Sequence, residues 1–306
     1  MELNNSLHPT NLVTNKKTSK WKKRFHEYKW GYFFVAPMFI LFVIFSFIPV
    51  IRSIMLAFQN YDGSWGIENF QWMIGDRVFW IALKNTLIYT LVIVPKNLLL
   101  ALILASIIQP FSNKVQTFFR TAFYLPAVTS AVVFSLIWLW ILNPEMGFLN
   151  HLLGVFGLQK IGWLTNPDIA LWGIIFTDFV LAPGSGIILY LAAMNGIPKT
   201  LYEAAEIDGA GFFAKWWYIT VPLVKSTTLY LLIVYMIGSF QVFTKINIMT
   251  NGGPGNATQT IVKLIYDSAF KDYDWGYASA QALVLFIIIG IISLVQFKFF
   301  SNDVEY

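Results

Sequence analysis

Six long apolar runs constrain this chain more than any other feature of its sequence. They cover residues 31–51, 87–108, 118–142, 169–194, 223–248 and 278–300. A hydrocarbon core about 30 Å thick requires about 20 helical residues, whereas a barrel strand needs only about 10 residues of alternating polarity. Each run has 21 to 26 residues and can cross as a helix. The sequence therefore predicts an all-α polytopic membrane protein with six transmembrane helices.

The composition agrees with this fold and argues against several classes of function. Hydrophobic residues make up 57% of the 306 residues and charged residues only 12%, whereas soluble domains carry about 25% charged residues. The absence of cysteine excludes disulfides, thiolate catalysis and cysteine-bound metals. The three histidines, His8, His26 and His151, are scattered in polar or flanking segments. We expect no metal site, no cofactor and no catalytic residue.

Lysine and arginine predict the orientation of the helices. Seven of the 21 basic residues fall within the first 29 positions, directly before the first apolar run. With a cytoplasmic N-terminus, thirteen basic residues face the cytoplasm and seven face outward, which is the bias typical of membrane proteins. We expect a basic cytoplasmic tail over residues 1–30 and a cytoplasmic C-terminus over 303–306. Such a tail favours anionic lipid over nucleic acid as its partner.

The loop between the fourth and fifth runs, residues 197–222, has the composition of a soluble surface. It contains EAAEIDGAG at 203–211, in which three carboxylates lie among alanines and glycines. The apolar residues fall near one helical face and the carboxylates mostly on the other. We expect a helix that Gly209 and Gly211 end by left-handed backbone angles, and a second short piece that Pro222 stops. The acidic face argues against lying on anionic lipid and favours docking into another protein.

This stretch resembles the EAA signature of the permease subunits of ABC importers. EAAEIDGA, followed by Ile219 and Pro222, is similar to the carbohydrate-uptake branch, the family of the maltose and glycerol-phosphate permeases. Nearly the whole chain after residue 30 resembles that family. The other stretches that carry the likeness lie at 46–62, 118–150, 238–243, 250–260 and 266–286.

The resemblance implies a type I ABC importer permease fold in a bacterial inner or plasma membrane. It implies a permease domain over 31–302, with a core over about 83–302. The implied partners are a second permease subunit, two cytoplasmic ATPase subunits and an extracytoplasmic binding protein that delivers a sugar, expected to be an oligosaccharide. The sequence has no GxxxxGK[ST] motif, so ATP hydrolysis is expected on the partners. The residues implied to contact an ATPase are Glu203, Ala204, Ala205, Asp208 and Gly209.

Charged residues within the apolar runs are candidates for a substrate pathway, because charge is costly to bury in lipid. Asp178 lies four residues before the APGSG break at 182–186, and Lys96 lies in the second run. The two could form a structural pair or could line a cavity. Members of the family more often carry an uncharged residue at the position of Lys96, so an unusual or anionic substrate is one interpretation. The other candidates are Gln241, Tyr190 and Tyr235.

Two further alternatives stay open, and a third is not supported. The outer loop TNGGPGNATQT at 250–260 is either a plain tight turn or an element near the binding-protein contact. An ion-driven secondary transporter would work without ATP or partner proteins. A membrane-embedded enzyme has no support, because no carboxylate pair, histidine cluster or nucleophile shares one expected membrane depth.

Overall fold

The computed structural model of the chain describes residues 20–300. Residues 1–19 and 301–306 lie outside the described part, and so do most of the expected basic tail and the expected C-terminal segment 303–306. Within the described part, the chain is helical apart from turns, loops and one bridge between Gln59 and Trp65. The all-α fold class is confirmed. The chain divides into two units, Met1–Ser53 and Ile54–Tyr306.

The first unit is a long helical segment, and its side chains from Tyr28 to Ser53 are exposed or half-buried. It contains α1 (Lys20–Phe42), the π-helical turn η1 (Val43–Phe47) and the start of α2 (Ile48–Ala57). Phe34 and Met38 are 75% and 76% exposed. A helix that is apolar all round is typical of a membrane span. The segment Tyr28–Ala57 is long and apolar enough to be one.

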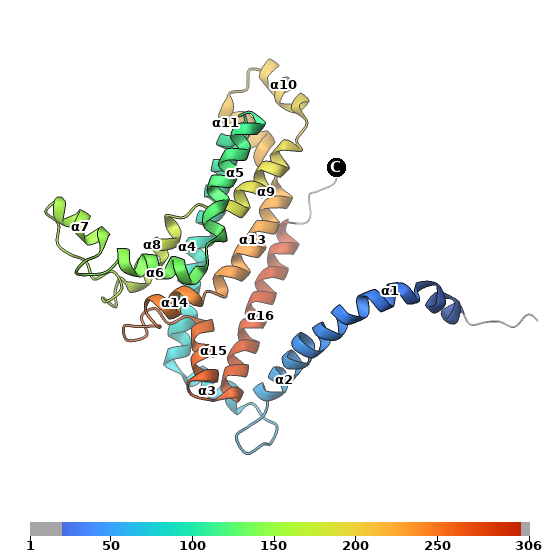
Figure 1. Ribbon diagram of the computed structural model, residues 1–306, viewed down its shortest axis with the longest axis vertical. Helices are drawn as coiled ribbons and strands as arrows, with labels where there is room; N and C mark the ends of the chain where they lie inside the picture. Colours follow the sequence, from blue (N-terminus) through green and yellow to red (C-terminus); the bar gives the residue numbers. More distant parts are fainter. Residues whose placement is uncertain (1–19, 301–306) are drawn as a thin grey trace, which may run out of the picture. The chain divides into compact units, whose positions relative to one another are not determined.

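The second unit holds the remaining elements. They are α3 (Glu68–Gly75), α4 (Arg77–Ile108), α5 (Asn113–Val128), α6 (Ala131–Ile141), α7 (Phe148–Val155), α8 (Ala170–Phe179), α9 (Gly184–Asn195), α10 (Lys199–Ile207), α11 (Phe212–Lys215), η2 (Trp216–Thr220), α12 (Val221–Leu223), α13 (Lys225–Phe240), α14 (Thr244–Met249), α15 (Ile261–Phe270) and α16 (Trp275–Phe300). Helix α4 packs against α9 and α13, and α13 packs against α16 (Figure 1). Figure 1 places α10 and α11 at one end of these long helices and α3 and α15 at the other.

Five segments of the described chain are long and apolar enough to cross a membrane as they stand. The expected third span is different, because α5 and α6 meet at an angle of 86°. Thr129 is extended at the break, and the Ser130 side chain accepts a hydrogen bond from the Val132 amide at the start of α6. Counted as one broken span, this pair brings the number of candidate spans to six. The third run therefore departs from the single helix that its length predicts.

The largest core cluster lies where α4, α9 and α13 meet. Ala101 and Ala105 on α4 are buried against Ile187 and Leu191 on α9. A second close approach lies at the start of α9, where a Cβ on Gly184 would come within 2.3 Å of the Phe123 carbonyl oxygen. Small residues at such contacts allow membrane helices to pack closely. The break before Gly184 therefore lies inside the helix packing.

Candidate functional site

The loop 197–222, called the EAA loop below, presents α10 as a separate short helix. Gly209 has a φ of 79°. Its amide donates to the Glu206 carbonyl at 3.0 Å, and the Ala210 amide donates to the Ala205 carbonyl at 2.8 Å. This pair of bonds is the Schellman ending, which favours glycine. Gly211 has a φ of −71°, so the expectation of left-handed angles at both glycines is right for Gly209 and wrong for Gly211.

The second piece of the loop is longer than expected. Helix α11 continues without interruption through η2 into α12. Pro222 therefore lies inside α12 and does not stop the piece. The wider π-helical turn just before it is one way in which a helix adjusts to the missing proline amide.

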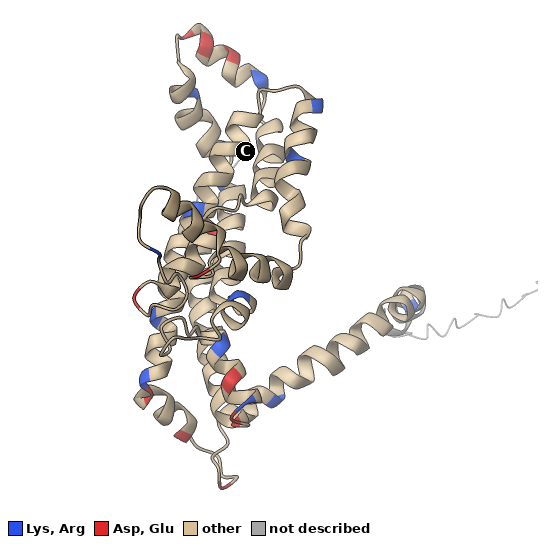
Figure 2. Cartoon of the chain, turned by 60° about the vertical axis from the view of Figure 1, so that its left-hand side comes forward, with Lys and Arg blue, Asp and Glu red and all other residues tan. Residues whose placement is uncertain are grey.

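Most of α10 is free of contacts with the rest of the chain. Glu203, Ala204, Asp208 and Gly209 are exposed, and Ala205 is half-buried. The apolar Ile207 is 88% exposed. Figure 2 shows acidic segments on this projecting loop. A helix this short gains little stability by itself, so its exposed faces are available to a partner.

The base of the EAA loop is fastened to the membrane helices. The indole Nε1 of Trp216 donates to Ser106 Oγ on α4 at 2.8 Å. The hydroxyls of Tyr202 and Thr220 share a hydrogen bond of 2.9 Å across the loop. These bonds connect α10 to η2, and η2 to α4.

A charged cluster lies among the helices of the second unit, with Asp178 at its centre. One carboxylate oxygen of Asp178 pairs with Lys245 Nζ on α14. The other accepts a hydrogen bond from the Tyr89 hydroxyl on α4 at 2.5 Å. The side chains of Lys245 and Asp178 are only 19% and 13% exposed. The carboxylate thus pairs with Lys245 and not with Lys96.

Lys96 contacts the same segment through its backbone. Its Nζ donates to the Asp178 carbonyl at 2.7 Å, to the Leu181 carbonyl at 2.5 Å and to Asn97 Oδ1 at 3.2 Å. Helix α8 ends nearby, and the Asp178 carbonyl already accepts from the Leu181 amide at 3.2 Å. The Lys96 ammonium is an additional donor there, and a cation at this end complements the helix dipole. Lys96 and Asp178 are therefore in contact, but the contact joins an ammonium to a main-chain oxygen and is not the side-chain pair that was one of the two alternatives.

Three helix breaks surround this cluster. They lie between α5 and α6, between α8 and α9, and between α13 and α14. Helix α14 packs against α6 and α8, and Lys245 Nζ lies 5.0 Å from the centre of the Phe134 ring on α6. Gln241 is exposed at the third break. Interrupted helices in membrane transporters line cavities and binding sites.

The two tyrosines expected to contact substrate lie in the core. Tyr190 is fully buried and donates to Thr228 Oγ1 at 3.0 Å. Tyr235 packs against the same cluster of α4, α9 and α13. Sequence reasoning did not count Tyr89 or Lys245 among the pathway residues. The charge of Lys245 within an apolar run was a usable signal, whereas nothing distinguished Tyr89 among 14 tyrosines.

The outer loop, residues 250–260, is hydrogen-bonded to side chains of α4. Asn85 Nδ2 on α4 donates to the carbonyls of Ala257 and Gln259 at 3.0 and 2.9 Å, with a longer bond to Asn256 at 3.4 Å. Thr86 Oγ1 accepts from the Ile261 amide at 3.0 Å. Thr258, Gln259 and Thr260 are buried. The outer loop is therefore a partly buried segment that is hydrogen-bonded to α4, and it is not a plain surface turn.

A charged network supports the outer loop. Asp267 accepts from Lys263 at 2.5 Å, pairs with Lys271 at 2.7 Å and accepts from Gln259 at 3.1 Å. Burial raises the pKa of Asp267, but the hydrogen bonds from the two lysines and Gln259 outweigh it and hold this pKa below its ordinary value. The network links α15 to the buried end of the loop.

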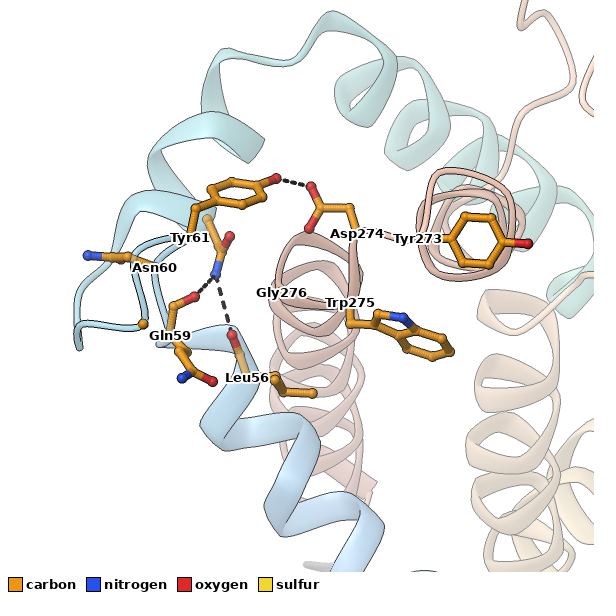
Figure 3. Close-up of a pocket in the computed structure, with 10 residues that line it drawn as sticks. Leu56, Gln59, Asn60, Tyr61, Tyr273, Asp274, Trp275 and Gly276 are labelled. Carbon is orange, nitrogen blue, oxygen red and sulfur yellow. Dashed lines mark hydrogen bonds between the residues drawn. The ribbon is translucent and has the colours of Figure 1, made fainter.

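A polar pocket of about 290 Å³ joins the end of α2 to the start of α16 (Figure 3). The Tyr61 hydroxyl donates to the Asp274 carboxylate, which raises the pKa of Tyr61 to about 12. Asn69 Nδ2 donates to the carbonyls of Ala57 and Gln59 at 3.1 and 3.0 Å. These bonds fasten the end of α2 and the loop after it to α3 and to the residue just before α16.

Comparison with known proteins identifies the family to which this chain belongs. The model of the family described as "Binding-protein-dependent transport system inner membrane component" matches residues 97–306. The chain is 35% identical to the probable ABC transporter permease protein YurN of Bacillus subtilis (strain 168), over 90% of this chain and 97% of that protein. It is 32% identical to the arabinooligosaccharides transport system permease protein AraP of the same organism, over 96% and 95%.

A solved structure shares the fold. It is the crystal structure of a bacterial alginate ABC transporter in complex with alginate pentasaccharide-bound periplasmic protein, and one of its chains matches with a TM-score of 0.81 at 26% identity. The match covers 90% of this chain and 94% of that chain. The family match takes in the end of α4 and all of α5 to α16, which include the EAA loop and the three helix breaks. The chain therefore belongs to the binding-protein-dependent transport system inner membrane components, the permease subunits of ABC transporters.

Proposed function

We propose that this chain is a permease subunit of an ATP-driven importer of oligosaccharides. Its relative AraP is named for arabinooligosaccharides. The structural neighbour was solved with a periplasmic protein that holds an alginate pentasaccharide. Both names point to short carbohydrate chains, and the second places the sugar-bound protein in the periplasm. A binding protein delivers the sugar, and a second permease subunit completes the pathway.

The exposed helix α10 carries the proposal. Its acidic residues and its free apolar Ile207 suit a groove with basic groups at the rim. We assign Glu203, Ala204, Ala205, Asp208 and Gly209 to the contact with one of two ATPase subunits. ATP is hydrolysed on those partners. The EAA loop and both termini then face the cytoplasm, and the permease domain extends over 31–302 with its core over about 83–302.

The contacts at the base of the loop support a coupling mechanism. Movement of α10 with a closing ATPase is transmitted through Trp216 and Ser106 to α4. Helix α4 also carries Lys96 and Tyr89, which hold the segment around Asp178. The substrate pathway passes this charged cluster, where three helices are interrupted. The transporter therefore alternates between states that open to opposite sides.

Reconstitution tests this proposal. The chain is placed in proteoliposomes with its second permease, its ATPase subunits and its binding protein, and oligosaccharide uptake is measured with and without internal ATP. We expect uptake only when ATP and all partners are present. Uptake by the permease without ATPase subunits, driven by an ion gradient, would instead identify a secondary transporter.

A further inference from the structure

The charged cluster contains more positive than negative charge. Lys96 and Lys245 supply two cations, and Asp178 supplies one carboxylate. Both oxygens of that carboxylate are already engaged, one by Lys245 and the other by Tyr89. The cluster has therefore no free anionic acceptor among the described residues, although a charge among membrane helices is costly unless it is paired.

The two lysines differ in how fully they are satisfied. Lys96 uses its three donors on two carbonyl oxygens and one amide oxygen. The partial negative charge at the end of α8 offsets part of its own charge. Lys245 makes one hydrogen bond within residues 20–300, to Asp178, and otherwise faces the ring of Phe134. Lys245 thus keeps donors for a group that enters between the broken helices.

We infer that the oligosaccharide carried by this permease is anionic, with a carboxylate that Lys245 binds during passage. The inference rests on the proposed import function. A sugar hydroxyl could accept a hydrogen bond from Lys245, but it brings no charge to balance the cluster. A uronate carboxylate brings both the acceptors and the missing negative charge. Lys245 is therefore a specificity-determining residue. Lys96 holds the break between α8 and α9 in place, and Asp178, which lies beside that break, orients Lys245.

The test compares matched acidic and neutral substrates in the complete reconstituted importer. The probes are trisaccharides from alginate, polygalacturonate and a glucuronate polymer, each used as such and after reduction of its carboxylates to alcohols. We expect at least one acidic trisaccharide to be taken up with ATP, at least about tenfold faster than its reduced form. Equal or faster uptake of the reduced forms would overturn the inference while leaving the import function intact.

Variants of the permease show whether the preference for the acidic form comes from the permease or from the binding protein, because the binding protein is the same in every assay. Lys245→Met should lose the preference for the acidic form, and Lys245→Arg should keep it. Because Lys245→Met leaves Asp178 unpaired, the double variant Asp178→Asn with Lys245→Met provides a second test with the pair removed together. Lys160→Met, on an exposed lysine, is the matched control. An unchanged preference in both Lys245→Met backgrounds contradicts the inference, and so does a lack of ATP-dependent uptake of every acidic form. Uptake of either form without ATPase subunits contradicts the import function itself.

Discussion

The EAA loop and the outer loop both contain glycines and both interrupt apolar segments, yet one is exposed and the other is partly buried. The EAA loop exposes four of the five residues expected to contact an ATPase, two on α10 and two just after it. In the outer loop, Thr258, Gln259 and Thr260 are buried, and Asn85 donates to its carbonyls. Polar groups buried in a protein need partners, and the outer loop finds them within its own chain.

The difference indicates where each loop works. A segment whose hydrogen bonds and apolar contacts are complete gains little from another protein. A short exposed helix with acidic and apolar faces is stabilised when a partner covers it. Substitutions in the outer loop should therefore reduce the stability of the chain, whereas substitutions in α10 should reduce transport without unfolding it.

The largest loss of stability is expected for Asn85→Leu. This change removes the donor from the carbonyls of Ala257 and Gln259 and should lower the free energy of unfolding by about 2–3 kcal/mol. The thermal unfolding midpoint of the purified protein measures the loss. Asn256→Gly is the control, because Asn256 is exposed with a φ of 67° and its backbone bonds remain. An unchanged unfolding temperature for Asn85→Leu would show that the hydrogen bonds from α4 do not stabilise the outer loop.

Glu203→Lys should have the largest effect on transport with little effect on stability. The reversed charge would repel the basic rim expected on the ATPase, and we expect uptake to fall about tenfold or more. Uptake in proteoliposomes and unfolding temperature are measured together. Asp168→Lys makes the same charge change at an exposed position outside the loop and should transport normally. Normal uptake by Glu203→Lys would show that the charge of α10 is not needed for its contact with the ATPase.

Gly209→Ala and Gly211→Ala sharpen the comparison within the EAA loop. Gly209 has a positive φ of 79° and Gly211 a φ of −71°. An alanine at Gly209 should cost about 1 kcal/mol in the ending of α10 and reduce uptake a few-fold. An alanine at Gly211 should change neither. Equal effects of the two substitutions would show that the Schellman ending is unimportant for coupling.

The smallest predicted effect is a loss of stability in acid that depends on Asp267. Its folded pKa lies below the ordinary 3.8, so its contribution is present above that value and is lost as the pH falls through the lower folded pKa. Asp267→Asn should remove this part of the acid sensitivity. The two proteins are compared by unfolding temperature between neutral pH and about pH 3. Parallel curves would mean that the network adds no pH-dependent stability.

The sequence predicts the spans well because their signal is local. A run of apolar residues long enough for the hydrocarbon core specifies a helix without knowledge of its neighbours. The 86° break between α5 and α6 is different. It depends on how α6 packs against α14, which lies far along the chain. Run length alone therefore could not distinguish one helix from two.

The candidate site divides in the same way. The end of α10 at Gly209 follows from a residue type that tolerates positive φ. The partner of Asp178 does not follow from local sequence, because Lys245 is 67 residues away and its approach depends on two helix breaks. The sequence indicates that Lys96 and Asp178 could be neighbours. It does not indicate that Lys96 binds the backbone at a helix end, because such a contact has no sequence signature.

Crosslinking from α10 tests the central claim most directly. The chain has no cysteine, so Glu203→Cys places a single reactive thiol on the EAA loop, and Asp168→Cys provides one outside it. Both variants are assembled with their partners in proteoliposomes and treated with a thiol-directed photocrosslinker. We predict that the thiol at position 203 crosslinks to an ATPase subunit and that the thiol at position 168 does not. Crosslinks from position 203 to lipid alone, in an importer that still transports, would contradict the account.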